Sequence, residues 1–346
     1  MKNIIFTFLY LLFSNTSFSI GQIDYVKIDN ISKNVKANTL DSLSYKLTHN
    51  LTSEEEKVRA IFRWITNNIS YDVQGYYNKN IYKEIENKLD ESDSKNYELN
   101  YNKLVVEKVF KEKKAVCDGY SRLFKYLCEL SNLKTEIISG YGRITTDTIG
   151  VTGQINHSWN AVKLDKKWFL LDVTWASGYT NNSVTKYYKK YNNLYYLTSP
   201  EIFIKNHLPE NQQWTLLNKT IKIDSFFNAP IFYDDYFKLN IKNISPEFGI
   251  ITLDSTKRIK FEIEVDKADS TLVIIENYFD NKTKTRKDNF KYLPNATLLI
   301  NKCKSEYKID ESKITLYYKV QKPTTDILYL LYKGKYIIEY RIKNEN

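Results

Sequence analysis

The chain has 346 residues, of which 42% are hydrophobic and 27% charged. This composition is typical of a globular protein and excludes a disordered or collagen-like chain. The net charge is +10, but 51 basic residues are interspersed with 41 acidic ones, so we expect a solvated surface and no nucleic-acid partner. Three cysteines are too few for a disulfide framework.

Residues 1–21 are predicted to be a secretory signal peptide. Lys2 precedes an apolar run over residues 4–13, and Ser19 and Gly21 suit a cleavage site. The run is shorter than the ~20 apolar residues that a membrane span requires. We therefore expect an exported protein, periplasmic or extracellular, with no membrane-spanning segment after cleavage.

The first half of the mature chain is predicted to be mainly helical. Thr52 and Glu55 fit a capping box at the start of a helix. Apolar residues then recur at helical spacing, at Val58, Ile61, Phe62, Ile65 and Ile69. Residues 74–101 show little periodicity and are interpreted as a surface connection whose length is typical of functional or disordered loops. Further helices are expected over 103–113 and 118–131.

The pattern then changes to strands. Segments rich in Ile, Val, Trp and Phe predict strands at 134–144, 156–164 and 167–175, the last two forming a hairpin that turns near Asp165 and Lys166. Residues 176–218 are predicted to be loop and short helix. From residue 219 to 346, short strands separated by turn residues predict a separate β-sandwich, with strands at 248–252, 258–265, 271–278, 315–320 and 327–342.

Cys117 is the candidate nucleophile. It stands at the start of a predicted helix, where unpaired N–H groups and the helix dipole stabilise a thiolate, and Gly119 leaves room for close approach. Cys128 lies eleven residues further on, or ~16 Å along a continuous helix, which is beyond disulfide reach. Cys128 is therefore predicted to be a buried apolar residue, and Cys303 falls in the other domain.

His157 and Asp172 are the candidate partners of this thiol. If the hairpin turns at 165–166, Asp172 lies opposite Trp159, and His157 shares the face of Trp159. His157 and Asp172 are then diagonal neighbours. A carboxylate beside an imidazole fixes its tautomer, and the imidazole can take the proton of a thiol, which is the logic of a Cys-His-Asp triad.

These segments carry a family resemblance. The stretches VCDGYSRLFKYLCEL (116–130) and NHSWNAVKLDKKWFLLDVTWASG (156–178) resemble the core of the transglutaminase-like superfamily of papain-like thiol enzymes. AIFRWITNNISYD (60–72) resembles the block that precedes the Cys in these proteins. SPEIFIKNHLPENQQWTLL (199–217) resembles the post-core segment of the kyphoscoliosis peptidase branch, whose members also carry β-sandwich domains.

The resemblance implies an α+β fold. A transglutaminase-like (papain-like) core over 22–218 would be followed by an all-β, immunoglobulin-like sandwich over 219–346. By resemblance, Cys117 is the nucleophile, His157 the general base and acid, and Asp172 the orienting carboxylate. The backbone N–H of Cys117 would be the first oxyanion donor. The indole N–H of Trp64 is a candidate for the second, with core packing as its alternative.

The implied reaction is acyl transfer through a thioester on protein or peptide amide bonds. Water as acceptor gives a cysteine peptidase or amidase, and an amine gives a protein-crosslinking transglutaminase. A third alternative is a non-catalytic protein-binding scaffold that retains the fold and works through its β-sandwich, whose partner is not specified by the sequence.

The remaining histidines and tryptophans receive structural interpretations. His207 is expected to pin the post-core segment, and His49 has no motif around it. Trp159 and Trp175 either line the cleft or pack in the core. The scattered His and Cys lack metal-binding spacing, and no cofactor-binding motif is present, so we expect no metal and no cofactor.

Overall fold

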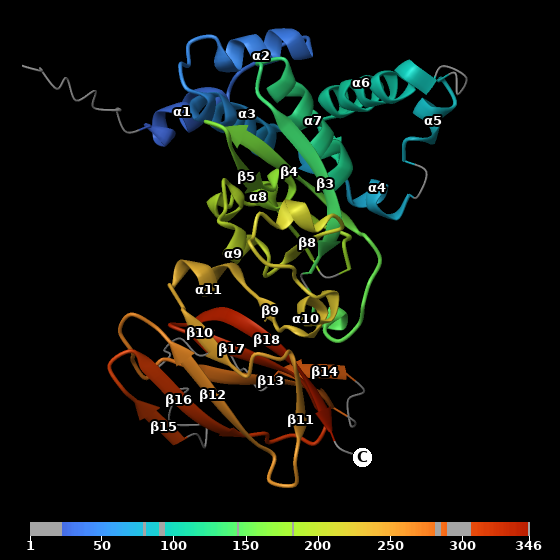
Figure 1. Ribbon diagram of the computed structural model, residues 1–346. Helices are drawn as coiled ribbons and strands as arrows, with labels where there is room; N and C mark the ends of the chain where they lie inside the picture. Colours follow the sequence, from blue (N-terminus) through green and yellow to red (C-terminus); the bar gives the residue numbers. More distant parts are fainter. Residues whose placement is uncertain are drawn as a thin grey trace, which may run out of the picture.

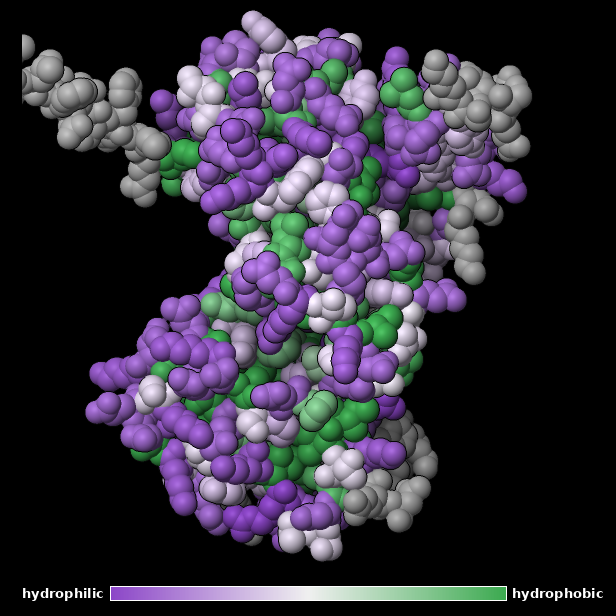
Figure 2. Space-filling model, in the orientation of Figure 1, coloured by the Kyte–Doolittle hydropathy of each residue, from purple (hydrophilic) through white to green (hydrophobic). Residues whose placement is uncertain are grey.

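The computed structural model describes residues 23–78, 81–89, 94–143, 145–181, 183–280, 285–288 and 306–344. The predicted signal peptide at 1–21 and Cys303 lie outside the described residues. The chain forms a part that mixes helices and a sheet, at the top of Figure 1, and a β-rich part below it. Hydrophilic residues cover most of the upper part on the face seen in Figure 2. No described helix combines the length and the apolar character that crossing a bilayer requires.

Helices surround one side of the upper part. They are α1 (Tyr25–Ser32), α2 (Leu40–Thr48), α3 (Glu54–Asn68), α4 (Val73–Tyr77), α5 (Lys83–Glu86), α6 (Ser94–Glu112) and α7 (Cys117–Glu129). The short parallel strands β1 (Ser70–Tyr71) and β2 (Lys114–Ala115) pair between them. The predicted apolar face of α3 is confirmed, because its members are fully buried: Val58, Ile61, Phe62, Ile65 and Ile69.

The capping box of α3 lies one residue later than predicted. The Ser53 hydroxyl accepts a hydrogen bond from the Glu56 N–H at 3.2 Å, and Glu56 accepts one from the Ser53 N–H at 3.0 Å. The pairing of Thr52 with Glu55 was therefore wrong. Both pairs fit the motif, but the Glu55 carboxylate is occupied by the hydroxyl of Tyr25 on α1.

The prediction of a surface connection over 74–101 was also wrong. Helices α4 and α5 lie within it, and α6 begins at Ser94 rather than near 103. The first half of α6 is held by polar and aromatic contacts instead of an apolar stripe. Tyr97 and Tyr101 stack with ring centroids 6.3 Å apart, and Arg122 of α7 reaches Glu98 at 3.4 Å. Such contacts leave no helical hydrophobic period in the sequence.

A four-stranded antiparallel sheet packs against α7, in the order β5-β4-β3-β8. Its strands are β3 (Thr135–Gly142), β4 (His157–Leu164), β5 (Lys167–Leu171) and β8 (His207–Pro209). The predicted hairpin is confirmed: Asn160 pairs with Leu171, and Leu164 with Lys167. Asp165 and Lys166 form its turn with φ of 45° and 70°, as a two-residue type I′ turn requires.

The last predicted strand ends earlier than expected. It was predicted to run to residue 175, but β5 stops at Leu171, and Asp172 caps the short helix α8 (Val173–Ser177). The helix forms because the Asp172 side chain accepts hydrogen bonds from two N–H groups of its first turn. The chain continues through β6 (Gly178–Thr180), β7 (Tyr187–Lys189) and α9 (Pro200–Phe203), with 3₁₀ turns at Asn193–Tyr195 and Gln212–Thr215. A further 3₁₀ turn, Thr146–Thr148, lies between β3 and β4.

The C-terminal part is β-rich. After α10 (Ile223–Asn228), β9 (Ile231–Phe232) and α11 (Asp234–Lys238), one sheet has the order β10-β12-β16-β15 and the other β11-β18-β17-β13-β14, with β9 beside β18. The strands are β10 (Asn243–Ser245), β11 (Ile250–Leu253), β12 (Arg258–Glu264), β13 (Val273–Asp280), β14 (Thr285–Asp288), β15 (Glu306–Ile309), β16 (Lys313–Lys319), β17 (Thr325–Tyr332) and β18 (Lys335–Asn344). Phe261 and Leu316 of the first sheet share a core with Leu330 and Tyr340 of the second, which is consistent with the predicted sandwich.

Two buried polar side chains join the upper part to this β-rich part. Arg143, which follows β3, is fully buried and donates to the backbone carbonyls of Phe226 and Ala229, the latter at 2.7 Å. Burial lowers the pKa of Arg143 to about 10. Asn206, directly before β8, donates its amide to the carbonyl of Phe232 in β9 at 3.2 Å. The edge of the core sheet is therefore tied to the β-rich part.

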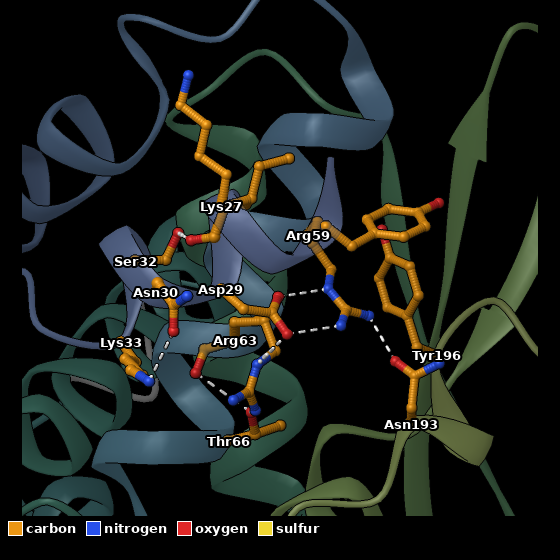
Figure 3. Close-up of polar contacts among 12 residues, drawn as sticks. Lys27, Asp29, Asn30, Ser32, Lys33, Arg59, Arg63, Thr66, Asn193 and Tyr196 are labelled. Carbon is orange, nitrogen blue, oxygen red and sulfur yellow. Dashed lines mark hydrogen bonds and ion pairs between the residues drawn. The ribbon is translucent and has the colours of Figure 1, made fainter. Parts of the chain in front are cut away.

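An ion-pair cluster fastens α1 to α3 (Figure 3). The Asp29 carboxylate lies 2.6 Å from Nε of Arg59 and 3.0 Å from Nε of Arg63. Arg59 also donates to Asn193 at 2.6 Å, and its guanidinium lies 4.6 Å from the ring centre of Tyr196. Asp29 thus compensates two largely buried cations while Arg59 links three segments of the chain.

We predict that D29N destabilises the protein by about 2 kcal/mol, because two mostly buried guanidinium groups lose their counter-charge. Urea denaturation of the wild type and the variant measures the change. The matched control is E112Q, which removes the carboxylate of the exposed Lys108–Glu112 pair and should cost less than about 0.5 kcal/mol. Equal effects of the two variants would contradict the structural importance of the Asp29 cluster.

Candidate active site

Cys117 is the first residue of α7 and is partly exposed. The preceding residue, Val116, provides no side-chain hydrogen bond to the helix start, so the first N–H groups stay available to a negative charge on the sulfur or on a substrate. Gly119 is needed for close packing, because a Cβ atom there would lie 2.6 Å from the Tyr82 hydroxyl and 2.9 Å from Val109.

His157 and Asp172 meet through the hairpin register. His157 begins β4 and Asp172 directly follows β5, so the two are diagonal neighbours across the strands. The Nε2 atom of His157 lies 2.7 Å from Oδ2 of Asp172. Oδ1 of Asp172 accepts from the N–H groups of Thr174 and Trp175 at 2.7 and 3.0 Å. Both carboxylate oxygens are therefore fixed.

The orientation of the His157 ring leaves its second nitrogen for the thiol. Because Nε2 is bound to Asp172, Nδ1 is the nitrogen left for Cys117, which contributes to the raised pKa of His157. The ring of Trp175 stacks on His157 with centroids 5.1 Å apart, and Trp159 lies 5.9 Å away. Trp159 is fully buried, so it packs in the core, whereas Trp175 is partly exposed beside the imidazole.

His207 joins the same carboxylate, which sequence reasoning missed. Its Nε2 lies 3.1 Å from Oδ2 of Asp172, and the pairing of β8 with β3 sets His207 beside Gly142. The expected pinning of the post-core segment thus occurs through the carboxylate of the site. One feature of the sequence could have pointed to His207. The chain has only three histidines, so each of them was a candidate for the site.

The pKa values of the two imidazoles, His157 and His207, are shifted in opposite directions. Burial lowers the pKa of His157, but the charge and hydrogen bond of Asp172, with a contribution from Cys117, outweigh it and raise this pKa to about 10. Burial dominates at His207 and lowers its pKa to about 4, even though Asp172 opposes the shift. Burial alone would raise the pKa of Asp172, but His157 and His207 hold it well below its usual value.

The indole N–H of Trp64 is bound away from the residues of this site. Its indole N–H donates to the carbonyl of Val35 at 2.9 Å, and its ring is 2% exposed within the helical core. The candidate assignment of Trp64 as an oxyanion donor is corrected accordingly, because the hydrogen that it would donate is already bound. Its alternative interpretation as a core aromatic describes its position.

Comparison with known proteins identifies the domain that carries these residues. Residues 41–173 match the model of the transglutaminase-like superfamily. They form a transglutaminase-like domain. The chain is 29% identical to kyphoscoliosis peptidase of Homo sapiens over 238 residues, covering 68% of this chain and 33% of that protein. It is 29% identical to the Mus musculus protein of the same name over 214 residues, covering 61% and 29%.

A third relative is Hillarin of Drosophila melanogaster, 26% identical over 247 residues, covering 66% of this chain and 27% of Hillarin. The chain thus spans about a third or less of the length of these curated relatives. The predicted superfamily and its kyphoscoliosis peptidase branch are confirmed by the domain match and by these similarities.

Among all the residues that the structure describes, one group of side chains is spaced closely enough to surround a metal ion. It consists of His157, Asp172 and His207, whose nearest donor atoms all lie within 4.8 Å. Both Nε2 atoms are hydrogen-bonded to Asp172 and therefore present protons, not lone pairs, to the centre of the group. The arrangement fits a hydrogen-bonded network better than a metal site.

A tyrosine surface adjoins the site. Tyr71 follows α3 and interacts by charge with both Cys117 and Asp172. From Tyr71, neighbouring rings 5.0 to 6.4 Å apart lead to Tyr76 and Tyr77 on α4 and to Tyr187 on β7. We define the tyrosine surface as Tyr71, Tyr76, Tyr77 and Tyr187. Tyr76 and Tyr77 are 52% and 62% exposed, which makes them available for contact with a macromolecule.

The raised pKa of His157 predicts a specific pH dependence of stability. In the unfolded chain its pKa returns to the ordinary 6.5, and in the folded chain it is about 10. Protonated His157 therefore adds to the free energy of unfolding. This contribution is fully present below pH 6.5 and is lost as the pH rises toward 10, so the free energy of unfolding falls by up to about 1.4 kcal/mol per pH unit.

Urea denaturation between these two pH values measures this contribution. H157Q should remove the decline, while the control H49Q, at an exposed histidine, should retain it. An H157Q profile that declines as steeply as that of the wild type would show that His157 is not held protonated by the fold.

Proposed function

We propose that this chain is a thiol acyl-transfer enzyme in which Cys117 is the nucleophile, His157 the general base and acid, and Asp172 the orienting carboxylate. The observation that carries the proposal is the buried 2.7 Å hydrogen bond between His157 and Asp172, beside a cysteine at the start of α7. This arrangement supplies each of the three roles that nucleophilic thiol catalysis needs.

The geometry supports the following sequence of steps. Sγ of Cys117 attacks the amide carbonyl, and its proton resides on Nδ1 of His157. The oxyanion receives the backbone N–H of Cys117 at the start of α7. His157 then gives its proton to the leaving amine, and a thioester forms. An incoming water or amine transfers a proton to His157 and attacks the thioester carbonyl. The C–S bond then breaks, the acyl group leaves on the acceptor, and the proton on His157 balances the charge on Sγ of Cys117 or returns to it.

The substrate class that we propose is a protein or peptide amide, with water as the acceptor, so that the chain acts as a cysteine peptidase or amidase. The tyrosine surface supports a polypeptide substrate, because tyrosine offers rigid apolar area together with a hydroxyl. The mammalian relatives are named kyphoscoliosis peptidase, which points the same way.

The proposal includes export after removal of residues 1–21, a domain boundary near 219 and an immunoglobulin-like character of the β-rich part. Residues 22–218 would then act outside the cytoplasm, with the β-rich part as a second unit. Export is supported by the N-terminal sequence pattern, and the boundary by the two separate hydrophobic cores on either side of it.

Protein crosslinking, with an amine in place of water as the acceptor, is the alternative to peptidase activity. The stacking of Trp175 on His157 favours it, because an aromatic wall at this position would limit the access of water to a thioester. An amine that carried its own apolar chain would enter such a cleft more readily. The scaffold alternative retains the fold without turnover and makes Cys117 dispensable.

We predict selective alkylation of Cys117. Iodoacetamide should modify Cys117 much faster than the fully buried Cys128 between about pH 4 and pH 9, and H157Q should slow the reaction roughly 10²-fold. Mass spectrometry of each cysteine peptide measures both rates in one sample. Slow alkylation of Cys117 in the wild type, unchanged by H157Q, would refute an assembled thiol site.

We further predict that turnover depends on Cys117 and reveals the acceptor. C117A should lower peptide hydrolysis by at least about 10⁴-fold, because the substitution removes the thiol proposed to form the thioester. Hydrolysis of a peptide library and incorporation of a fluorescent primary amine into casein are measured side by side, with C128A as the control. Predominant amine incorporation would favour crosslinking, and activity in C117A would contradict the thiol mechanism.

A further inference from the structure

The oxygen Oδ2 of Asp172 accepts two hydrogen bonds from two histidines. His157 donates Nε2–H at 2.7 Å and His207 donates Nε2–H at 3.1 Å, and all three side chains are almost wholly buried. The mechanism proposed above uses His157 and Asp172 but leaves His207 without a role. A buried imidazole is costly unless its polar atoms are bound, so its presence calls for a physical reason.

We propose that His207 is a positioning residue that holds Oδ2 of Asp172 on the Nε2–H of His157. Its effect on catalysis rests on the proposed function, but the hydrogen bond itself does not. Two backbone N–H groups fix Oδ1, and His207 fixes the rotation of the second oxygen. The carboxylate therefore keeps the single orientation in which His157 turns Nδ1 toward Cys117.

The contact requires a proton on Nε2 of His207, and burial keeps the ring neutral. Asp172 is ionised and offers only lone pairs, so each histidine must place a proton on Nε2. Burial keeps the pKa of His207 near 4, so at neutral pH its ring carries one proton, and the contact with Asp172 places that proton on Nε2. The nearby Tyr195 ring, 5.9 Å away, stays protonated because burial raises its pKa.

The surroundings hold the His207 ring in place for this contact. Its centroid lies 4.1 Å from that of Phe203 and 4.2 Å from that of Trp175. The neighbouring Asn206 binds the Phe232 carbonyl of β9, which ties the strand of His207 to the β-rich part. A phenylalanine could fill the space between these rings, but it could not donate to Asp172.

The first test uses the wild-type protein. Nitrogen-15 NMR distinguishes a histidine protonated on Nε2 from one protonated on Nδ1, and three histidines can be assigned by single substitutions. We expect His207 to be neutral and protonated on Nε2 from about pH 6 to pH 8. A His207 protonated only on Nδ1 would overturn the proposal, whatever the activity of the protein.

The second test compares H207F with H207Q. H207F keeps an aromatic ring but no donor, whereas the side-chain amide of H207Q keeps a donor at a similar distance from the backbone. We expect H207F to slow Cys117 alkylation about tenfold, the equivalent of one hydrogen bond to a charged group, and H207Q to slow it less. The control H49F replaces an exposed histidine and should leave the rate unchanged.

The titration of His157 separates positioning from packing. In H207F the pKa of His157 should fall toward its ordinary value, because Oδ2 is free to turn away, and H207Q should restore it partly. A rise in H207F would show that His207 competes for the oxygen, and identical values in all variants would show that it only packs; either result overturns the proposal. Since this titration needs no turnover, it decides the question even if Cys117 proves unreactive.

Discussion

The buried carboxylate of Asp172 is the constraint on which this site depends. An ionised carboxylate that is wholly removed from water is very unfavourable unless its lone pairs are bound. Four donors bind it here: two backbone N–H groups of α8 and the Nε2–H groups of His157 and His207. To collect them, β5 must stop at Leu171, α8 must begin at once, and β3 must lie between β4 and β8. The order of the strands and the end of β5 at Leu171 are therefore needed to bind the Asp172 carboxylate as well as to form the hydrophobic core.

The same requirement connects the site to the rest of the molecule. The strand β8 supplies His207 on one side and, through Asn206, a hydrogen bond to β9 of the β-rich part on the other. Arg143, at the end of β3, makes a second buried connection to the same region. A displacement of the β-rich part would thus act on the edge of the core sheet and on the strand that carries His207. Two neighbouring residues therefore do both tasks: Asn206 attaches the β-rich part, and His207 orients the carboxylate of Asp172.

The features that sequence reasoning predicted are those set by local pattern. The turn at Asp165 and Lys166 and the alternation of the two strands fix the register, so the neighbourhood of His157 and Asp172 could be derived before the structure was known. The features it missed depend on contacts distant in sequence. His207 meets Asp172 across 35 residues, and the indole of Trp64 meets a carbonyl 29 residues earlier. The first half of α6 was missed for a related reason, since it is held by Tyr97 and Arg122 and not by an apolar stripe.

Two histidines bind one oxygen of Asp172, and in the proposed mechanism one of them would act as the acid and base. The environment of each ring favours His157 for that role. His207 has a side chain closed off on all sides by aromatic rings and strand β3, and its pKa near 4 keeps it neutral. His157 retains slight exposure, and its pKa is about 10, with Asp172 and Cys117 both raising it. Environments that push two pKa values so far apart assign different roles to the two groups. A protonated His207 would place a second buried positive charge beside His157 and would lower the pKa of His157. A neutral His207 leaves Asp172 to stabilise a single imidazolium, that of His157.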